Sequence, residues 1–362
     1  MSIQYMENFQ SYGDADTPSD SDLLDGTPWI SLGDAVNTDR IVTNPDGTDR
    51  VFRVLGGSIS GATNTARLAL PSPSAVVGVG FRIYLTRLPE NLLERPAVYF
   101  MNGSNQRIAR LTIEPNGAMK LSRYASNYST ETQVAATSVP VIAASSWFHF
   151  ELRINNSTGG MEVRREGTTI ADLTVAGSGA LNEATTSIIG FASVHPGSGS
   201  APFNMYIKDL VVWDNQGSQN NSFIGPVSVT LLSVVSDVSS GWTSTGANAF
   251  SVLDETTPND ADYVSADDSP PAPVIMELSD LSGDIVAVRA LQTMVRAKKS
   301  DGGDANLQVS LISGVAEDNG GNNPITTGYK YWMDISELDP ATATAWSPIS
   351  VNAARIKLDR TV

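Results

Sequence analysis

The chain has 362 residues, no cysteine, two histidines and a formal net charge of -16. Its length exceeds the usual size of one domain, so two domains are expected. The absence of cysteine excludes disulfides, thiolate chemistry and cysteine-ligated zinc. No basic cluster is larger than Arg296-Ala297-Lys298-Lys299. Nucleic acid is therefore not expected as a partner, because binding a polyanion requires cationic contacts.

The opening residues, Met1 to Met6, have neither the basic nor the apolar region of a signal peptide. No apolar run approaches the length needed to span a bilayer. We expect synthesis in the cytoplasm, no membrane insertion, and release by a route other than secretion.

An Asp-rich loop at residues 14–25 comes first along the chain. Asp14, Asp16 and Asp20 are candidate calcium ligands, because calcium prefers oxygen donors. The loop does not match an EF-hand, since Asp25 stands where that motif has Glu. Calcium is the only cofactor that the sequence leaves open, and a solvated loop without metal is the alternative.

Short Val/Ile/Thr-rich runs separated by Gly and Pro predict an all-β protein. Expected strands in the first part are 50–55, 66–70, 76–85, 147–154, 161–165, 168–175, 187–192 and 207–214. Asn102-Gly103 and Asn116-Gly117 predict hairpins with type I′ turns. Roughly ten to twelve strands would form two packed sheets.

The best-defined strand is 147–154, in which apolar and polar residues alternate. Phe148, Phe150, Leu152 and Ile154 are expected on the core face, and Trp147, His149, Glu151 and Arg153 on a solvent face. Glu151 and Arg153 suggest a cross-strand ion pair of little energetic value.

The polar stretch 214–222 predicts a domain boundary, which gives domains 1–222 and 223–362. In the second domain we expect strands at 223–229, 306–313 and 329–335, a long extended run at 285–297, and a last amphipathic segment at 349–358. Together these predict a smaller β-sandwich.

The first domain resembles the laminin-G-like and concanavalin A-like jelly rolls. The resemblance is carried by the aromatic strand that opens Trp147-Phe148-His149, by the strand pair after it, and by a closing strand, Ile207 to Asp214. In that family an early strand such as Met6 to Gly13 pairs with the closing strand. The same sandwich carries lectins, glycosidases and structural proteins, so the resemblance predicts the fold and leaves the function open.

The second domain resembles the C-terminal module of tailed-bacteriophage virion proteins that also bear a laminin-G-like domain. Its motifs occur in the same order: Phe223-Ile224-Gly225, Gly241-Trp242-Thr243, Asp254-Glu255 and Asp339-Pro340 with Ala345-Trp346-Ser347. The resemblance implies a virion structural protein that assembles in the host cytoplasm with other tail or capsid proteins. It also implies a homo-oligomer, with a trimer favoured.

Patterns for catalysis are missing from the sequence. The Glu-x-Asp-x-x-Glu run of jelly-roll glycosidases does not occur, and neither does a Gly-x-Ser-x-Gly elbow. His149 and His195 have no second histidine nearby to complete a zinc site. We therefore expect that the protein is not an enzyme.

Jelly rolls of this family bind glycans through exposed aromatic and polar side chains. The candidates here are Trp147, His149, Tyr124 and Tyr128. The alternative is that these side chains fill the sheet or a subunit interface.

Three hypotheses follow. The first is a tail-fibre or tail-tip protein that contacts the host surface, with a host glycan as ligand, through one sandwich and docks to the particle through the other. The second is a capsid decoration or head-fibre protein with a purely structural role. The third, carried by the fold family alone, is a carbohydrate-active enzyme.

Overall fold

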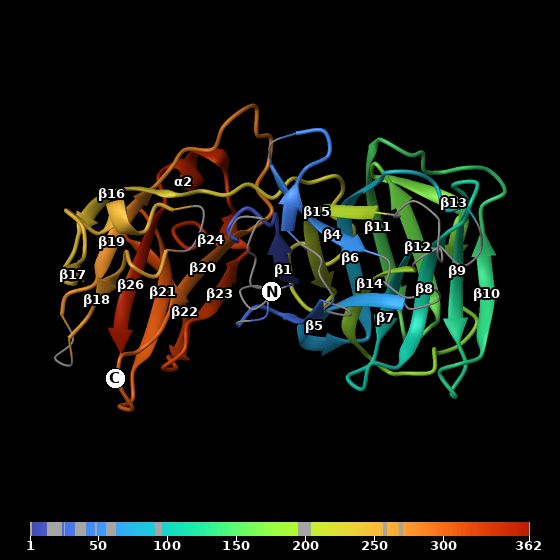
Figure 1. The fold of residues 1–362 in the computed structure, drawn as a ribbon, viewed down its shortest axis with the longest axis horizontal. Helices are drawn as coiled ribbons and strands as arrows, with labels where there is room; N and C mark the ends of the chain where they lie inside the picture. Colours follow the sequence, from blue (N-terminus) through green and yellow to red (C-terminus); the bar gives the residue numbers. More distant parts are fainter. Residues whose placement is uncertain are drawn as a thin grey trace.

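The computed structural model describes residues 2–12, 24, 26–32, 41–47, 49–55, 63–90, 96–194, 204–255, 259–267 and 271–361. Almost all regular structure in these residues is β. Figure 1 shows two lobes, with the N-terminal strand between them.

The first lobe is a sandwich of two antiparallel sheets, and its strands come from the first part of the chain. In sheet A the order is β13 (Thr168–Val175), β12 (Gly160–Arg165), β11 (Trp147–Asn155), β6 (Val76–Leu85), β15 (Asn204–Asp214), β4 (Arg50–Leu55) and β3 (Ile41–Thr43), with β1 (Ile3–Glu7) also paired to β15. In sheet B the order is β10 (Glu131–Ala136), β9 (Met119–Tyr124), β8 (Arg107–Ile113), β7 (Ala97–Met101), β14 (Thr186–Val194), β5 (Thr63–Ser74) and β2 (Trp29–Leu32).

The two sheets enclose one large apolar core. From β11, Phe150, Leu152 and Ile154 enter this core, as the alternation in the sequence predicts. Trp29 and Phe52 lie at its centre with their ring centroids 4.9 Å apart. The jelly-roll sandwich predicted from the sequence is confirmed.

The opening segment pairs with the closing strand as predicted, but the early strand is β1, Ile3–Glu7, and of the predicted Met6 to Gly13 it contains only Met6 and Glu7. β1 runs antiparallel to β15, with Ile3 opposite Trp213 and Glu7 opposite Leu210. The Trp213 ring lies on the outer face of sheet A against Gly78, where an added Cβ would stand 2.2 Å from its Cε2 atom. The absence of a side chain at Gly78 therefore makes room for the indole.

Both predicted Asn-Gly hairpins form, but the predicted type I′ turns are wrong. Between β8 and β9 the Gly117 N–H donates to the Glu114 carbonyl, so Pro115 and Asn116 are the central residues of the turn, and the positive φ, 79°, belongs to Gly117 after them. Between β7 and β8 the positive φ, 62°, belongs to Asn105 instead of Gly103. In both cases the loop is longer than two residues, which removes the need for two successive positive φ values.

The second lobe contains sheet C, with the order β16 (Val234–Ser239), β19 (Val274–Leu278), β26 (Arg355–Thr361), β21 (Asn306–Ser313) and β22 (Ala316–Pro324). Three two-stranded ribbons accompany it: β17 (Thr243–Ser244) with β18 (Val264–Ser265), β20 (Leu291–Ala297) with β23 (Lys330–Ser336), and β24 (Leu338–Asp339) with β25 (Thr344–Ala345). The helical elements are η1 (Phe250–Val252) and α2 (Pro348–Asn352).

The β20–β23 ribbon covers one face of sheet C, so this lobe is the smaller sandwich that the sequence predicts. Val295, Ala297 and Trp332 of the ribbon pack against a small core that includes Val309 and Leu358. Ser310 of β21, between Val309 and Leu311, is fully buried.

Residues 223–229, which we call the strap, do not form the predicted strand. The strap instead crosses the outer face of sheet A. Its backbone N–H groups at Ile224 and Gly225 donate to Glu151 Oε1, at 2.7 and 3.0 Å, and the N–H of Val229 donates to Asp209 Oδ1. Gly225 has φ 82°, and Pro226 has no N–H, so the chain here is unsuited to a sheet ladder.

The strap also bears on the predicted boundary near residue 222. Strands β1 to β15 build the first lobe and β16 onward the second, yet the strap packs on the first lobe. The boundary itself stays a prediction.

Candidate functional site

The outer face of sheet B carries a transverse row of side chains from five neighbouring strands. Strand register places Arg67 of β5 beside Gly190 of β14, then Tyr99 of β7, Arg110 of β8 and Ser122 of β9. All of them alternate with residues of the sandwich core, so they share the outer face. Gly190 carries no side chain, and the Met101 methyl group fills the space above it, because an added Cβ would stand 2.8 Å from that methyl group.

Arg107 lies above two tyrosine rings in the middle of this face. Its guanidinium carbon is 5.0 Å from the Tyr99 ring centroid and 5.8 Å from that of Tyr124. Both rings are only 4% exposed. The two rings therefore hold the guanidinium from below by cation–π attraction. Because they are buried, they are not available to stack on a sugar.

Arg110 is fixed by Glu131 of β10. Arg110 Nε donates to Glu131 Oε1 at 2.8 Å, and Nη2 lies 2.7 Å from Oε2. Burial lowers the pKa of Arg110, but nearby Tyr99, Tyr124 and Glu131 outweigh burial and raise it overall. The guanidinium stays charged in a fixed orientation, as bidentate pairing favours.

Several polar atoms on this face have no partner although they are buried. They include the Tyr124 hydroxyl, Thr112 Oγ1 and Arg67 Nε. Tyr124 is 4% exposed and Thr112 is 1% exposed. Burial raises the pKa of Tyr124 to about 12, so its hydroxyl keeps its proton. Buried polar groups in proteins are normally hydrogen-bonded, so these atoms are ready to bind a polar ligand or water.

At the rim of the face, Tyr128 and Glu183 form a polar edge. The Tyr128 hydroxyl donates to Glu183 Oε1, and Asn102 Nδ2 donates to the same oxygen at 2.8 Å. The Glu183 hydrogen bond raises the pKa of Tyr128. Tyr124 and Tyr128, both predicted from the sequence, thus lie on or beside one surface.

Trp147 and His149, the other two predicted glycan contacts, lie in sheet A. Trp147 is half-buried, its Nε1 donates to Asp46 Oδ1 at 2.9 Å, and Lys208 Nζ is 4.7 Å from its ring centroid. His149 is fully buried. The structure therefore does not bring these two residues together with Tyr124 and Tyr128.

The expectation that His149 and Glu151 point to solvent is wrong. Both are 0% exposed. The strap bonds to Glu151, and the ring nitrogens of His149 have no hydrogen-bond partner. Burial first, and then the Arg82 charge, lower the pKa of His149 to about 4, while burial raises the pKa of Glu151. The pattern of the strand identified two faces, but it could not show that another segment covers the second one.

The predicted calcium ligands Asp14, Asp16 and Asp20 lie outside the described residues, and so does His195. Within the part of the chain that the structure describes, no group of three His, Asp or Glu side chains is placed to hold a metal ion. The acidic residue Asp260 pairs instead with Arg296.

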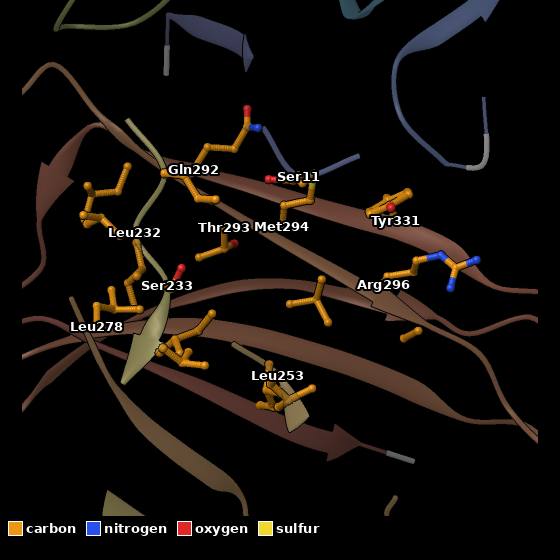
Figure 2. A pocket seen from close by; sticks show the side chains of 18 of the residues that line it. Ser11, Leu232, Ser233, Leu253, Leu278, Gln292, Thr293, Met294, Arg296 and Tyr331 are labelled. Carbon is orange, nitrogen blue, oxygen red and sulfur yellow. The ribbon is translucent and has the colours of Figure 1, made fainter. Parts of the chain in front are cut away.

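A cavity of about 1600 Å³ opens in the second lobe, between the β20–β23 ribbon, sheet C and the start of the chain. Figure 2 shows Leu232, Leu253 and Leu278 on one side of it and Met294 and Tyr331 on the other. No sequence pattern predicts this groove, because its lining comes from segments far apart in the chain.

Comparison with known proteins does not place the chain in a family. No protein-family model matches the chain, and no curated protein matches it. No helix among the described residues has the length and apolar character to cross a membrane.

Similar solved structures include a galectin-like protein of unknown function from Bacillus subtilis, with TM-score 0.39, 14% identity, and coverage of 59% of this chain and 96% of that one. Cellulose induced protein Cip1 gives TM-score 0.39, 14% identity, and coverage of 55% and 95%. The binding domain of botulinum neurotoxin serotype C1 gives TM-score 0.35, 18% identity, and coverage of 51% and 43%. The chain thus spans less than half the length of the neurotoxin structure. At these scores the likenesses do not bear on function.

Proposed function

We propose that this protein is a non-enzymatic structural component of a tailed-phage virion, a tail-fibre or tail-tip protein that contacts the host surface. The first sandwich makes that contact, and the second docks to the particle. The proposal starts from the sequence resemblance and is supported by the arrangement of the two lobes.

The observation that carries the proposal is the firm joint between the lobes. β1 is an edge strand of the first sandwich, and side chains of the second lobe bind its free edge. Glu337 accepts the N–H groups of Ser2 and Ile3 at 2.6 and 3.1 Å, and Gln292 bonds to both backbone groups of Met6. Because the second lobe binds the edge strand of the first, the two lobes are held together as one body. Such a body is suited to transmitting force from the host surface to the particle.

The two ends of this body present different surfaces. Strands β8 to β10 lie at one end and β16 to β19 at the other (Figure 1). The second lobe exposes Val286, Val315 and Ile349, at 94%, 103% and 83%. Exposed apolar side chains, of which Val286 lines the groove, favour docking to another virion protein or to further copies of the chain, with a trimer favoured.

The most perturbed acids of the first lobe support a role without catalysis. Glu7 is fully enclosed and accepts hydrogen bonds from the Tyr5 and Tyr12 hydroxyls at 2.7 and 2.6 Å. Burial raises the pKa of Glu7. Glu151 binds the strap. Both carboxylates are buried and hydrogen-bonded to groups of the fold.

Imaging of labelled virions tests the proposal. An antibody against the purified protein, detected with gold on intact particles of the phage that encodes it, should label the tail end in few copies. Labelling over the head in hundreds of copies would establish the decoration alternative. Unlabelled virions would overturn both, and depolymerisation of host polysaccharide by the purified protein would favour the enzyme hypothesis.

A further inference from the structure

The outer face of sheet B concentrates positive charge on a protein whose net charge is -16. Arg67, Arg107 and Arg110 come from β5 and β8, and within the described residues only Arg110 of these three pairs with a carboxylate, that of Glu131. The sequence shows no basic cluster here, because strand pairing brings together residues that are separated by about forty positions.

We propose that this face binds an anionic glycan, one whose sugars carry carboxylate or sulfate groups. The inference rests on the proposed host-contact function, and it names the ligand class and the residues. Arg107 and Arg67 pair with the acidic groups, and Arg110 borders the same row.

The geometry favours an extended ligand. Arg67 and Arg110 are three strand positions apart, a distance of about 14 Å between backbones. Between them, the Met101 side chain covers Gly190, so no long side chain stands on the row at that strand. A saccharide lying across the strands would meet a cation at each end.

The chemistry favours a glycan over a simple anion. The unpartnered hydroxyls of Tyr124 and Thr112 suit sugar hydroxyl groups, since each both donates and accepts hydrogen bonds. Because Tyr99 and Tyr124 lie beneath Arg107, recognition relies on the guanidinium instead of ring stacking. Guanidinium groups match planar carboxylates and sulfates in geometry.

The chemistry also disfavours nucleic acid. Glu131 and Glu183 border the face, and the overall charge repels a polymer with one charge per nucleotide. A glycan carries neutral hydroxyl groups beside its acidic groups, which a DNA backbone lacks.

The test measures binding of the purified full chain to polygalacturonate and dextran sulfate by affinity electrophoresis and calorimetry. Neutral dextran and a single-stranded oligonucleotide serve as comparison ligands. We expect binding to one or both anionic polysaccharides that weakens as salt rises, and none to dextran. Which of the two binds identifies carboxylate or sulfate as the recognised group.

Two variants assign the site. Arg67→Gln with Arg107→Gln should weaken binding at least about tenfold, since a charged hydrogen bond contributes that much. Arg355→Gln, which removes one positive charge from β26 in the other lobe, should leave affinity unchanged. Unchanged thermal melting of each variant shows that it is folded.

Equal binding by wild type and the double variant would overturn the inference, as would preference for the oligonucleotide or for dextran. Gold labelling separates this outcome from failure of the proposed function. If gold labels the tail but the protein does not bind anionic glycans, the host-contact proposal stands and the proposed ligand is wrong. If the protein binds these glycans through its arginines but is not found on virions, the ligand is right and the proposed function is wrong.

Discussion

Gln292 and the backbone of Met6 exchange two hydrogen bonds: the Met6 N–H donates to Gln292 Oε1, and Gln292 Nε2 donates to the Met6 carbonyl, both at 2.9 Å. A side-chain amide thus takes the place of a neighbouring strand at the free edge of β1. Figure 2 shows Gln292 reaching away from the cavity toward an N-terminal strand.

Replacing Gln292 with alanine should lower the free energy of unfolding by about 1–2 kcal/mol, because two hydrogen bonds between the lobes are lost. Urea denaturation measures the change, and hydrogen exchange should show faster exchange in β1. Gln133→Ala, on edge strand β10, is the matched control and should change stability by less than about 0.5 kcal/mol. Equal effects of the two substitutions would contradict a special role for Gln292.

Gly78→Ala should destabilise the first lobe by about 3 kcal/mol or more. The new methyl group would overlap the buried Trp213 indole, and overpacking of a filled site is costly. Thermal unfolding followed by near-UV circular dichroism reports on the indole directly. Gly103→Ala, whose nearest atom is Ser187 Oγ at 3.9 Å, should be tolerated. A wild-type melting temperature for Gly78→Ala would show that the ring moves aside easily.

Glu151→Ala should cost about 3 kcal/mol and release the strap. The substitution leaves the N–H groups of Ile224 and Gly225 without their acceptor in a covered position. Hydrogen exchange of residues 223–229 is the sharpest readout. Glu317→Ala removes an exposed ion pair with Lys357 and should cost less than about 1 kcal/mol. Unchanged protection of the strap in Glu151→Ala would mean that Phe223, packed on Trp213 and Arg164, holds it alone.

His149 should make the protein sensitive to acid. Its pKa is lowered from 6.5 to about 4 in the folded state, so the unfolded chain binds more protons between these values. Stability is therefore greatest above pH 6.5 and falls as the pH drops toward 4. The loss from this group is about 2 kcal/mol between pH 7 and pH 5.

Urea denaturation of wild type and His149→Asn at both pH values isolates that contribution. The buried carboxyls Glu7, Glu151 and Asp209 have raised pKa values and act in the opposite direction, since they favour the folded state at lower pH. The comparison between the two proteins cancels them. A variant that loses as much stability as wild type would show that His149 titrates normally.

Much of the fold follows from local pattern. The predicted strands 50–55, 76–85, 168–175 and 306–313 match β4, β6, β13 and β21 to the residue. In each case a run of β-formers ends at a turn signal, so local chemistry sets both ends. The pairing of β1 with β15 required the family resemblance, because nothing local joins segments two hundred residues apart.

The wrong predictions have a common cause. The burial of a side chain depends on tertiary contacts, which the local sequence pattern does not contain. Period-two alternation placed Phe150 and Leu152 correctly, yet it assigned His149 and Glu151 to water because the strap is remote in sequence. Residues 349–358 contain both helix α2 and β26. The signal for the helix was present, since Ser347 before Pro348 forms a capping box with Ser350. Arg67 and Arg107 gave no signal at all, because their neighbourhood exists only after the strands pair.

Because the strap packs on the jelly roll, it determines where a fragment that contains only this domain can end. A fragment that stops at residue 222 would uncover a carboxylate and an indole that the intact molecule keeps dry, and it would promote aggregation. A designer who wishes to transplant the module onto another scaffold should carry the polypeptide through residue 230.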